Sequence, residues 1–196
     1  MHSFFVNHKY FPDNILIPKD ESKLWIAFQE GDPQAYTEIY HRYIRDMYRY
    51  GSSLVTTSES FVLDCIQDVF TELWSKRERL SIPVNVKYYL LKALKTRIIH
   101  LLERKEKAYR PLADIDLELF ELNETEIAEE LETARDQQEK LEIFIRQLPN
   151  RQQEALKLRF VENLNYEQIG GMLQVNTQSA KNLVFRAIEK LRRMVL

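Results

Sequence analysis

The C-terminal segment limits the possible folds of this 196-residue chain more than any other part. Between Tyr166 and Leu173, apolar residues recur with the spacing of a short amphipathic helix. Residues 174–176 break that pattern, and the side chain of Asn176 can cap a second helix that begins at Thr177. The sequence therefore predicts a short helix, a tight turn and a longer helix, which is the plan of a helix-turn-helix.

The longer helix of this pair combines an apolar stripe with a polar outer face. Its N-terminal end and outer face carry Asn176, Thr177, Gln178, Ser179, Lys181, Asn182 and Arg186. Such a helix fits the major groove of DNA, where short polar groups reach base edges and basic groups reach phosphates. An ordinary helical hairpin with a solvated face has the same pattern, so this segment alone leaves both interpretations open.

The composition points to helices throughout the chain. There are only four glycines and six prolines, and no convincing alternating strand pattern appears. Residues 114–121 alternate acidic and apolar residues, a strand-like period in an otherwise helical chain. We therefore predict an all-α fold with two helical domains. No stretch approaches the ~20 apolar residues that span a membrane, and the N-terminal residues lack the pattern of a signal peptide. The single cysteine, Cys65, suits a reducing compartment, so we expect a cytoplasmic protein.

Residue types suited to catalysis or metal binding do not form a recognisable arrangement. The four histidines lack metal-ligand spacing with Cys65. The carboxylates Asp64 and Asp68 could form an acid–base pair, but no His, Ser or Lys arrangement converges near them in the sequence. We therefore expect no enzyme, no catalytic residue, no metal and no cofactor.

Charged residues are segregated along the chain, although the net charge is only −2. Residues 1–73 hold 6 Lys and Arg against 11 Asp and Glu, and residues 74–111 hold 11 against 3. Residues 112–145 hold 2 against 12, and residues 146–196 hold 9 against 4. Clustered lysines and arginines displace the counterions of phosphates. Two basic blocks separated by an acidic one therefore indicate two contacts with one DNA.

Helical periodicity also extends over most of the first half of the chain. It predicts a helix that begins at Leu24 and further helices over 33–52, 58–76 and 86–108. The domain organisation that we predict is an N-terminal arm (1–22), a first domain (23–108), an acidic linker (109–124) and a second domain (125–196). The first helix of the second domain is expected over 125–148, because Pro149 ends it.

The predicted helix over 58–76 carries an acidic face. Asp64, Gln67, Asp68 and Thr71 follow one another at intervals of three or four residues, so they share one side of the helix. Two carboxylates four residues apart repel each other. That repulsion is tolerable on a solvated surface and becomes favourable against a basic partner.

Two segments of the chain resemble conserved regions of one protein family. The segment DCIQDVFTELW resembles the Asp-x-x-Gln-Asp/Glu-x-Phe-x-x-x-Trp signature in region 2 of bacterial sigma factors. The segment LPNRQQEALKLRF…NYEQIGGMLQVNTQSAKNLVFRAIEKLR resembles their region 4. The two blocks, roughly 23–108 and 140–194, are joined directly by a short linker, as in group 4, extracytoplasmic-function sigma factors. The resemblance implies a promoter-specificity subunit that recognises −10 and −35 elements and assists promoter melting.

For the first domain, the resemblance implies a polymerase contact and a DNA contact. The acidic face would bind the clamp coiled coil of core RNA polymerase, while Phe70 and Trp74 are expected in the core, where burial alone is worth about 2 kcal/mol. The loop over 80–85 would capture a flipped base of the −10 element, since lost stacking must be offset. The residues expected at the −10 DNA are Asn85, Lys87, Tyr88, Lys92, Lys95, Arg97 and Arg104. Tyr88 and Tyr89 cannot both face the core.

For the second domain, the resemblance implies that Asn176 to Arg186 reads the −35 element. Arg151 and Arg159 would touch phosphate or brace the fold. The implied partners are core RNA polymerase, through its clamp coiled coil and flap, promoter DNA, and an anti-sigma factor, with no direct membrane insertion. Two alternatives are a helix-turn-helix regulator that acts on duplex DNA without polymerase and a helical adaptor that binds only protein.

The acidic segment over 112–145 allows three interpretations. It is rich in charge and in helix-forming residues, which is typical of a disordered linker. The resemblance implies a linker that threads polymerase channels and imitates a phosphate backbone. A third possibility is that it covers a basic face of the free protein.

Overall fold

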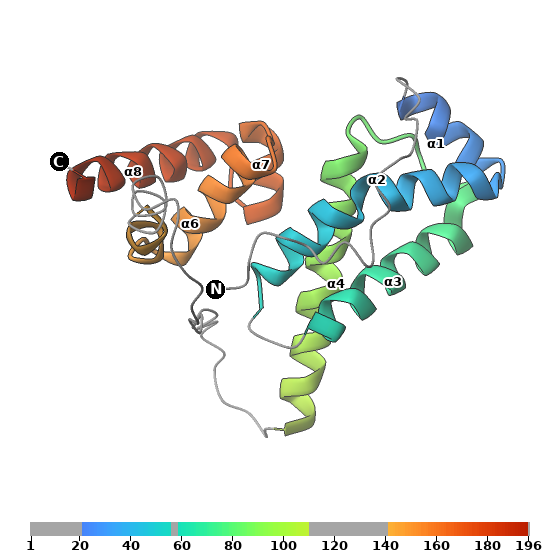
Figure 1. The fold of residues 1–196 in the computed structure, drawn as a ribbon, viewed down its shortest axis with the longest axis horizontal. Helices are drawn as coiled ribbons and strands as arrows, with labels where there is room; N and C mark the ends of the chain where they lie inside the picture. The colour runs from blue at the N-terminus through green and yellow to red at the C-terminus, as the bar shows by residue number, and fades with distance from the viewer. Residues whose placement is uncertain (1–20, 56–58, 110–140, 196) are drawn as a thin grey trace, which may run out of the picture. The chain divides into compact units, whose positions relative to one another are not determined.

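The structure, a computed structural model, describes residues 21–55, 59–109 and 141–195 (Figure 1). The described residues divide into two compact units, one of residues 21–109 and one of residues 141–195. The described residues form helices and connecting turns without any strand, which confirms the predicted all-α class. None of their helices has both the length and the apolar character needed to cross a membrane.

The first unit is built around one central helix. Its described elements are α1 (Glu21–Gln29), α2 (Pro33–Ser52), α3 (Glu59–Lys76), the 3-10 turn η2 (Arg77–Arg79) and α4 (Val86–Tyr109). Helix α2 contacts α1, α3 and α4 and is therefore central (Figure 1). The predicted bounds of α2 are confirmed, and those of α3 and α4 differ by one residue at one end. Helix α1 begins at Glu21, three residues before the predicted start.

Local sequence fixes the start of α2. The side chain of Asp32 caps the helix by accepting a hydrogen bond of 2.8 Å from the backbone N–H of Gln34. Pro33 occupies the first helical position, where its missing N–H would have had no partner. Gly31, with φ of 91°, takes the left-handed conformation that lets the chain turn between α1 and α2.

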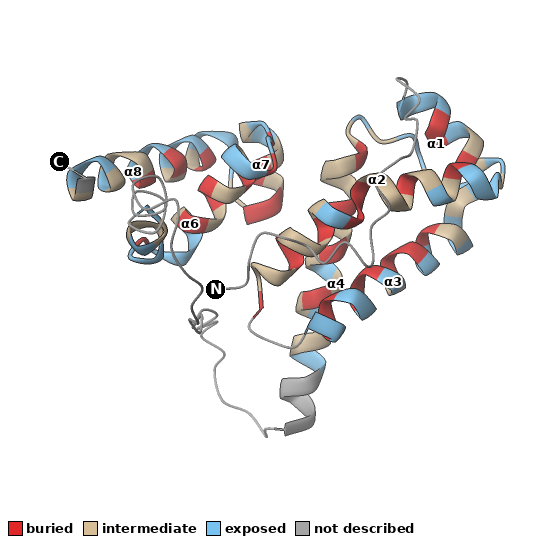
Figure 2. Ribbon diagram, viewed as in Figure 1, coloured by how far each residue is buried: buried red, intermediate tan, exposed pale blue. Residues whose placement is uncertain are grey.

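The core of the first unit combines aromatic and aliphatic side chains. Trp25, Phe28, Ile39, Met47 and Leu90 have no more than 1% of their surface exposed. They come from α1, α2 and α4, and Figure 2 shows the buried residues on the sides of the helices that face one another. Burying each such side chain contributes on the order of 2 kcal/mol, which holds the four helices in one unit.

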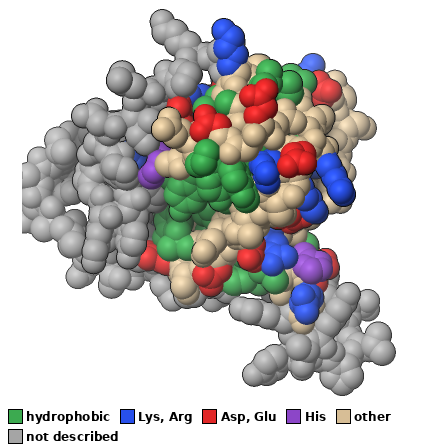
Figure 3. All heavy atoms as spheres, turned by 90° about the vertical axis from the view of Figure 1, so that its right-hand side faces the viewer, with side chains coloured by type: hydrophobic (Ala, Val, Ile, Leu, Met, Phe, Trp, Pro, Cys, Tyr) green, Lys and Arg blue, Asp and Glu red, His purple; other side chains and the backbone are tan. Residues whose placement is uncertain are grey.

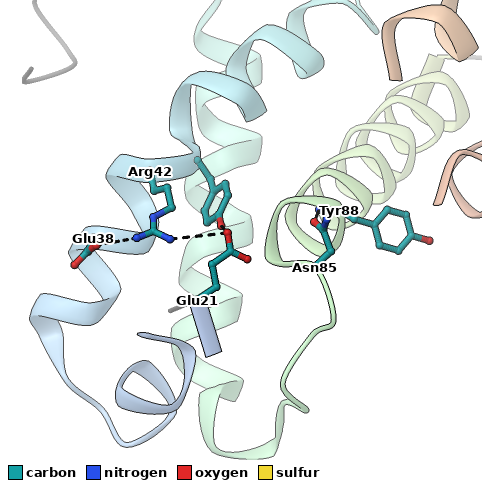
Figure 4. A network of polar contacts seen from close by, with 6 residues as sticks. Glu21, Glu38, Arg42, Asn85 and Tyr88 are labelled. Atoms are coloured by element: carbon teal, nitrogen blue, oxygen red, sulfur yellow. Dashed lines mark hydrogen bonds and ion pairs between the residues drawn. The ribbon is translucent and has the colours of Figure 1, made fainter. Parts of the chain in front are cut away.

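A network of polar contacts joins the start of α1 to α2 (Figure 4). Arg42 lies between two carboxylates, 3.1 Å from Glu38 Oε1 and 3.9 Å from Glu21 Oε1. The hydroxyl of Tyr43 donates a hydrogen bond of 2.7 Å to Glu21. Burial, together with this hydrogen bond, raises the pKa of Tyr43. The network therefore fixes α1 against α2 with the phenol in its neutral form.

The second unit contains the predicted helix pair and an unpredicted turn. After helical residues 141–146, its elements are α6 (Asn150–Leu156), the π-helical turn η3 (Lys157–Val161), α7 (Tyr166–Leu173) and α8 (Thr177–Val195). The predicted bounds of α7 and start of α8 are confirmed. Gln153 is buried, and its Nε2 donates to the carbonyl oxygens of Leu148 and Arg146. These two hydrogen bonds join the end of the helical segment 141–146, and the residues just after it, to α6.

Several expectations fall largely outside the described residues. Nearly all of the N-terminal arm (1–22) and of the acidic linker (109–124) lies there, as does most of the helix expected over 125–148. The three interpretations of segment 112–145 therefore stay open.

Candidate functional site

The acidic face of α3 is divided between solvent and a neighbouring helix. Asp64, Gln67 and Thr71 are exposed. Asp68 is half-buried, and its Oδ2 accepts hydrogen bonds from Arg97 Nε at 3.0 Å and Nη2 at 2.6 Å. Arg97 belongs to α4, so Asp68 is tied across the helix pair. Asp68 therefore has a partner within the protein, and the polymerase contact expected for the four residues stays a prediction.

Next to this face, aromatic rings from α2 and α3 form a half-buried surface, the aromatic shelf (Tyr36, Tyr40 and Trp74). The rings of Tyr36 and Trp74 lie 5.1 Å apart, and Tyr40 lies 4.9 Å from Phe70. Phe70 is buried, as predicted, but Trp74 is half-exposed and not fully in the core. Partial burial raises the pKa of Tyr36 and of Tyr40. Sequence reasoning did not single out either tyrosine as a surface residue.

Figure 3 views the molecule from the side on which α1 and the start of α2 lie in Figure 1. Hydrophobic side chains gather there in one central area, with separate basic and acidic side chains around it. An apolar area of this kind with a charged rim is the usual composition of a protein contact surface.

The loop between η2 and α4 is anchored at both ends. At its start, Gln29 Nε2 donates a hydrogen bond to the carbonyl oxygen of Leu80. At its end, Asn85 Oδ1 accepts a hydrogen bond of 2.7 Å from the backbone N–H of Tyr88 and so caps α4. Between these anchors, Ile82 is 47% exposed and Val84 is fully exposed. Sequence reasoning did not identify these two apolar side chains.

The basic residues of α4 differ in their exposure and in their contacts with other parts of the protein. Lys92 and Arg104 are exposed. Lys87 is half-buried, and its Nζ lies 2.8 Å from Asp46 Oδ2 on α2. Arg97 is bound to Asp68, and Lys95 is half-buried and also engaged. Three of these cations therefore have partners within the protein, and the expected contact of the whole set with −10 DNA stays a prediction.

The two adjacent tyrosines of α4 divide as predicted. Tyr89 packs edge-on against Trp25 at 5.6 Å, and burial raises its pKa. Tyr88 points away from the helix in Figure 4, and the ammonium of Lys92 lies 5.8 Å from its ring centre. Tyr88 is thus the tyrosine that is available beside the loop.

In the second unit, local capping fixes the angle between α7 and α8. Asn165 and Gln168 form a capping box at the start of α7. Gln174 ends α7 with φ of 55°, and Asn176 Oδ1 accepts from the backbone N–H of Ser179 at 2.7 Å. The N-cap predicted for α8 is therefore confirmed. A Cβ on Gly170 would lie 2.7 Å from the carbonyl oxygen of Val175, so the close turn requires glycine there.

The outer face of α8 presents most of the residues that the sequence suggested. Thr177, Gln178, Lys181, Asn182 and Arg186 are exposed with Asn176, and Ser179 is half-buried. Gln178 Nε2 donates to Asn182 Oδ1 at 3.2 Å, which aligns two amides along the helix. Phe185, which is 65% exposed, lies on the same helix and was not predicted. Phe185 lies one helical turn after Lys181 and next to Arg186, so helical spacing alone could have placed it on this outer face.

The two arginines before α7 have different surroundings. Arg159 Nη1 donates to the carbonyl oxygen of Leu164 at 3.0 Å, and its guanidinium lies 4.9 Å from the centre of the Tyr166 ring. Arg159 therefore braces the fold. Arg151 is exposed, with one long contact of 3.5 Å to the carbonyl oxygen of Leu173, and remains accessible to a phosphate.

Comparison with known protein families identifies both units. The model of sigma-70 region 2 matches residues 39–108, and the model of sigma-70 region 4 matches residues 144–193. Together the two models cover more than half of the chain. The chain belongs to the extracytoplasmic-function sigma factors. This sigma factor is therefore a promoter-specificity subunit of bacterial RNA polymerase, and the chain carries both promoter-binding regions in the family's order.

Curated relatives agree with this membership, and solved structures share the fold. The ECF RNA polymerase sigma factor SigM of Bacillus subtilis (strain 168) is 24% identical over 155 residues, which cover 79% of this chain and 91% of SigM. SigV of the same organism is 28% identical over 148 residues, covering 76% and 83%. This sigma factor also shares its fold with CnrH, solved with the cytosolic domain of CnrY (15% identity, TM-score 0.58, 90% and 97% covered). The sigma factor RpoE from Bartonella quintana, solved with the anti-sigma factor NepR, has the same TM-score at 17% identity, with 83% and 97% covered.

In the part of this sigma factor that the structure describes, no group of three or more His, Cys, Asp or Glu side chains is arranged to hold a metal ion. The features that stand out are surfaces: an exposed part of an acidic face, an aromatic shelf, an anchored loop and the polar face of α8.

Proposed function

We propose that this sigma factor places RNA polymerase at a promoter through three surfaces of its two units. The first unit docks on core polymerase and holds the −10 element, and the second unit binds the −35 element. The observation that carries the proposal is that α3 presents carboxylate and amide groups to solvent on the unit that also carries a basic helix and an anchored loop. A regulator that only bound duplex DNA would leave α3 and the loop without a role.

The docking surface in this proposal combines the exposed acidic residues of α3 with the aromatic shelf. Asp64, Gln67 and Thr71 would meet the clamp coiled coil of core polymerase, with Asp68 held at the edge by Arg97. Half-buried aromatic rings are frequent anchors of protein interfaces, because their apolar area is completed by a partner. The carboxylates would guide a basic partner to the surface, and the rings would slow its release.

The −10 surface would comprise the loop over 80–85 and the start of α4. Tyr88 is turned outward beside Asn85, and its ring can stack on an unpaired base. Lys92 and Arg104 are the exposed cations that would hold the DNA backbone. Lys87, Lys95 and Arg97 would contribute positive potential from positions that also brace α4.

The −35 surface would be the outer face of α8. Short polar side chains at Asn176, Thr177, Gln178, Ser179 and Asn182 can reach base edges, and Lys181 and Arg186 can reach phosphates. Arg151 would add a phosphate contact from α6, while Arg159 supports the fold. We add Phe185 to this surface, since an exposed aromatic ring on a reading helix can contact a thymine methyl group. The second unit would also meet the polymerase flap.

The mechanism is one of placement and strand capture. Binding at −35 fixes the upstream duplex, docking on the clamp fixes the first unit, and the loop stabilises an unstacked base of the −10 strand. The polymerase carries out nucleotide addition, so this sigma factor supplies no catalytic group and works without a cofactor of its own.

We also propose that an anti-sigma factor holds this protein inactive. The solved RpoE of Bartonella quintana is bound to the anti-sigma factor NepR, and CnrH is bound to the cytosolic domain of CnrY. Both share the fold of this chain, and a partner of that kind would cover the docking and DNA surfaces.

Promoter-dependent run-off transcription with purified core polymerase tests the proposal. We expect a specific transcript with this protein and none without it. The variant Asp64→Arg should abolish binding to core, whereas the matched charge change Glu30→Arg, on an exposed residue of the α1–α2 turn, should leave binding intact. Unchanged binding of Asp64→Arg to core would rule out the proposed docking face. If no promoter tested yields a transcript, this outcome would count against the sigma function.

A further inference from the structure

A side chain of α1 holds the start of the loop that precedes α4. Gln29 Nε2 donates a hydrogen bond to the backbone carbonyl oxygen of Leu80, 51 positions later in the chain. Both residues are half-buried, so the bond is partly shielded from competing water. Helix α1 therefore does more than cover the core, because it also ties down the loop.

The base of the loop is fixed on its other side by η2. The backbone N–H of Leu80 donates to the carbonyl oxygen of Arg77 at 3.3 Å. Arg77 Nη1 donates to the carbonyl oxygen of Trp74 at 3.0 Å, and its guanidinium lies 4.6 Å from the centre of the Trp74 ring. The Arg77 side chain also lies against Gly31 at the end of α1. Both backbone groups of Leu80 are thus bonded, and the base of the loop is part of the rigid unit.

Beyond Leu80 the loop carries exposed apolar side chains. Ile82 is 47% exposed and Val84 is fully exposed, before Asn85 starts the cap of α4. Exposed apolar side chains on a loop that is anchored at both ends are placed for contact with another apolar surface. The flat face of an unstacked base is such a surface.

We propose that Gln29 is a positioning residue for promoter opening: its amide fixes the base of the loop so that Ile82 and Val84 meet the face of the unstacked −10 base. This inference rests on the proposed function of the loop. Without the Gln29 bond, one anchor of the loop is lost and its tip samples more positions. Capturing a base would then require more ordering of the loop, which disfavours the open complex.

Loop mobility tests the structural half of this inference without any DNA. Cys65 is the single cysteine and is fully buried, so Val84→Cys adds one accessible thiol for a spin label at the loop tip. Gln29→Met keeps the length of the side chain and removes the donor, while Gln29→Lys keeps a donor. We expect a more mobile label with Gln29→Met and a return toward the parent spectrum with Gln29→Lys. An unchanged spectrum with Gln29→Met overturns the inference.

Permanganate reactivity of thymines in the −10 element tests the functional half, in holoenzyme and without the label. Gln29→Met should lower the equilibrium constant for promoter opening by up to about tenfold, the change expected from one lost hydrogen bond. Gln29→Lys should restore most of it, and Gln34→Met, an exposed glutamine of α2, is the matched control. Binding to core and to −35 duplex should stay constant in all variants. Gln29→Ala replaces the Met variant if circular dichroism shows that the latter does not fold.

The experiments distinguish a failure of this inference from a failure of the proposed function. If the parent protein opens promoters and Gln29→Met opens them equally well, Gln29 does not position the loop. If the parent protein binds core but opens no promoter, the proposed function of the loop fails first.

Discussion

Arg97 on α4 binds Asp68 on α3 through two nitrogens that share one carboxylate oxygen, Oδ2. The sequence suggested different partners for these residues, polymerase for Asp68 and DNA for Arg97. In the folded protein they meet each other, so the proposed docking helix and the proposed DNA-binding helix are linked by an ion pair. Asp68 Oδ1 makes neither of these two bonds.

A double-mutant cycle measures this link. We expect Asp68→Asn and Arg97→Met each to lower the free energy of unfolding of the first unit, with a coupling energy of about 0.5 kcal/mol, since both side chains are more than a third exposed and the pair is screened. Urea unfolding in low and high salt is the measurement. A coupling that does not shrink as salt is added would contradict an electrostatic link.

The end of α7 is strained at one residue, which predicts a stabilising substitution. Gln174 is exposed and has φ of 55°, a left-handed conformation that suits glycine. Gln174→Gly should raise the free energy of unfolding of the second unit by about 0.5–1 kcal/mol. Gln174→Ala is the control, because alanine meets the same strain and should give no gain. Thermal and urea unfolding of both variants provide the comparison.

Gly170 should not tolerate a methyl group. Its Cβ would approach the carbonyl oxygen of Val175 to 2.7 Å, and that oxygen belongs to the backbone of the tight turn. We expect Gly170→Ala to destabilise the second unit by about 1–3 kcal/mol and to weaken −35 duplex binding by moving α8. Unfolding curves and fluorescence anisotropy with a −35 duplex measure the two effects. Wild-type stability in this variant would show that the turn can open without cost.

Sequence reasoning located the helices of both units well because their signals are local. Periodic apolar residues and the break after Leu173 define α7 and the start of α8, and capping residues such as Asn176 sharpen the ends. The π-helical turn η3 was not anticipated, because the spacing of apolar residues does not distinguish a widened turn from an ordinary helical turn.

The candidate surfaces were predictable only in part. Spacing along α3 correctly grouped Asp64, Gln67 and Thr71, which are exposed. It could not show that Asp68 pairs with Arg97, 29 positions away, because that contact depends on the angle between two helices. The Gln29–Leu80 hydrogen bond could not be predicted from the sequence either, because it joins residues 51 positions apart that only the tertiary fold brings together.

Because several tyrosines of the first unit are buried or half-buried, we expect the protein to lose stability at high pH. Burial raises the pKa of Tyr36, Tyr40, Tyr43, Tyr48 and Tyr89. In the unfolded chain, phenols lose their protons near pH 10, while the folded protein keeps them. The unfolded state then binds fewer protons, so the free energy of unfolding should fall as the pH rises above about 10. Tyrosinate absorbance should rise together with unfolding, and free titration of these phenols in the folded protein would contradict the prediction.

Charged and apolar contacts of α8 with DNA should respond differently to salt. Arg186→Ala removes one proposed phosphate contact, so affinity for a −35 duplex should fall roughly tenfold and the dependence of log K on log salt should become shallower by about one. Phe185→Ala should lower affinity at every salt concentration with the slope unchanged, because an apolar contact releases no counterion. Lys190→Ala is the matched control, since this ammonium donates to the carbonyl oxygen of Gln147 at 3.0 Å. Equal slopes for Arg186→Ala and the parent protein would remove Arg186 from the phosphate contacts, and wild-type affinity in Phe185→Ala would remove Phe185 from the reading face.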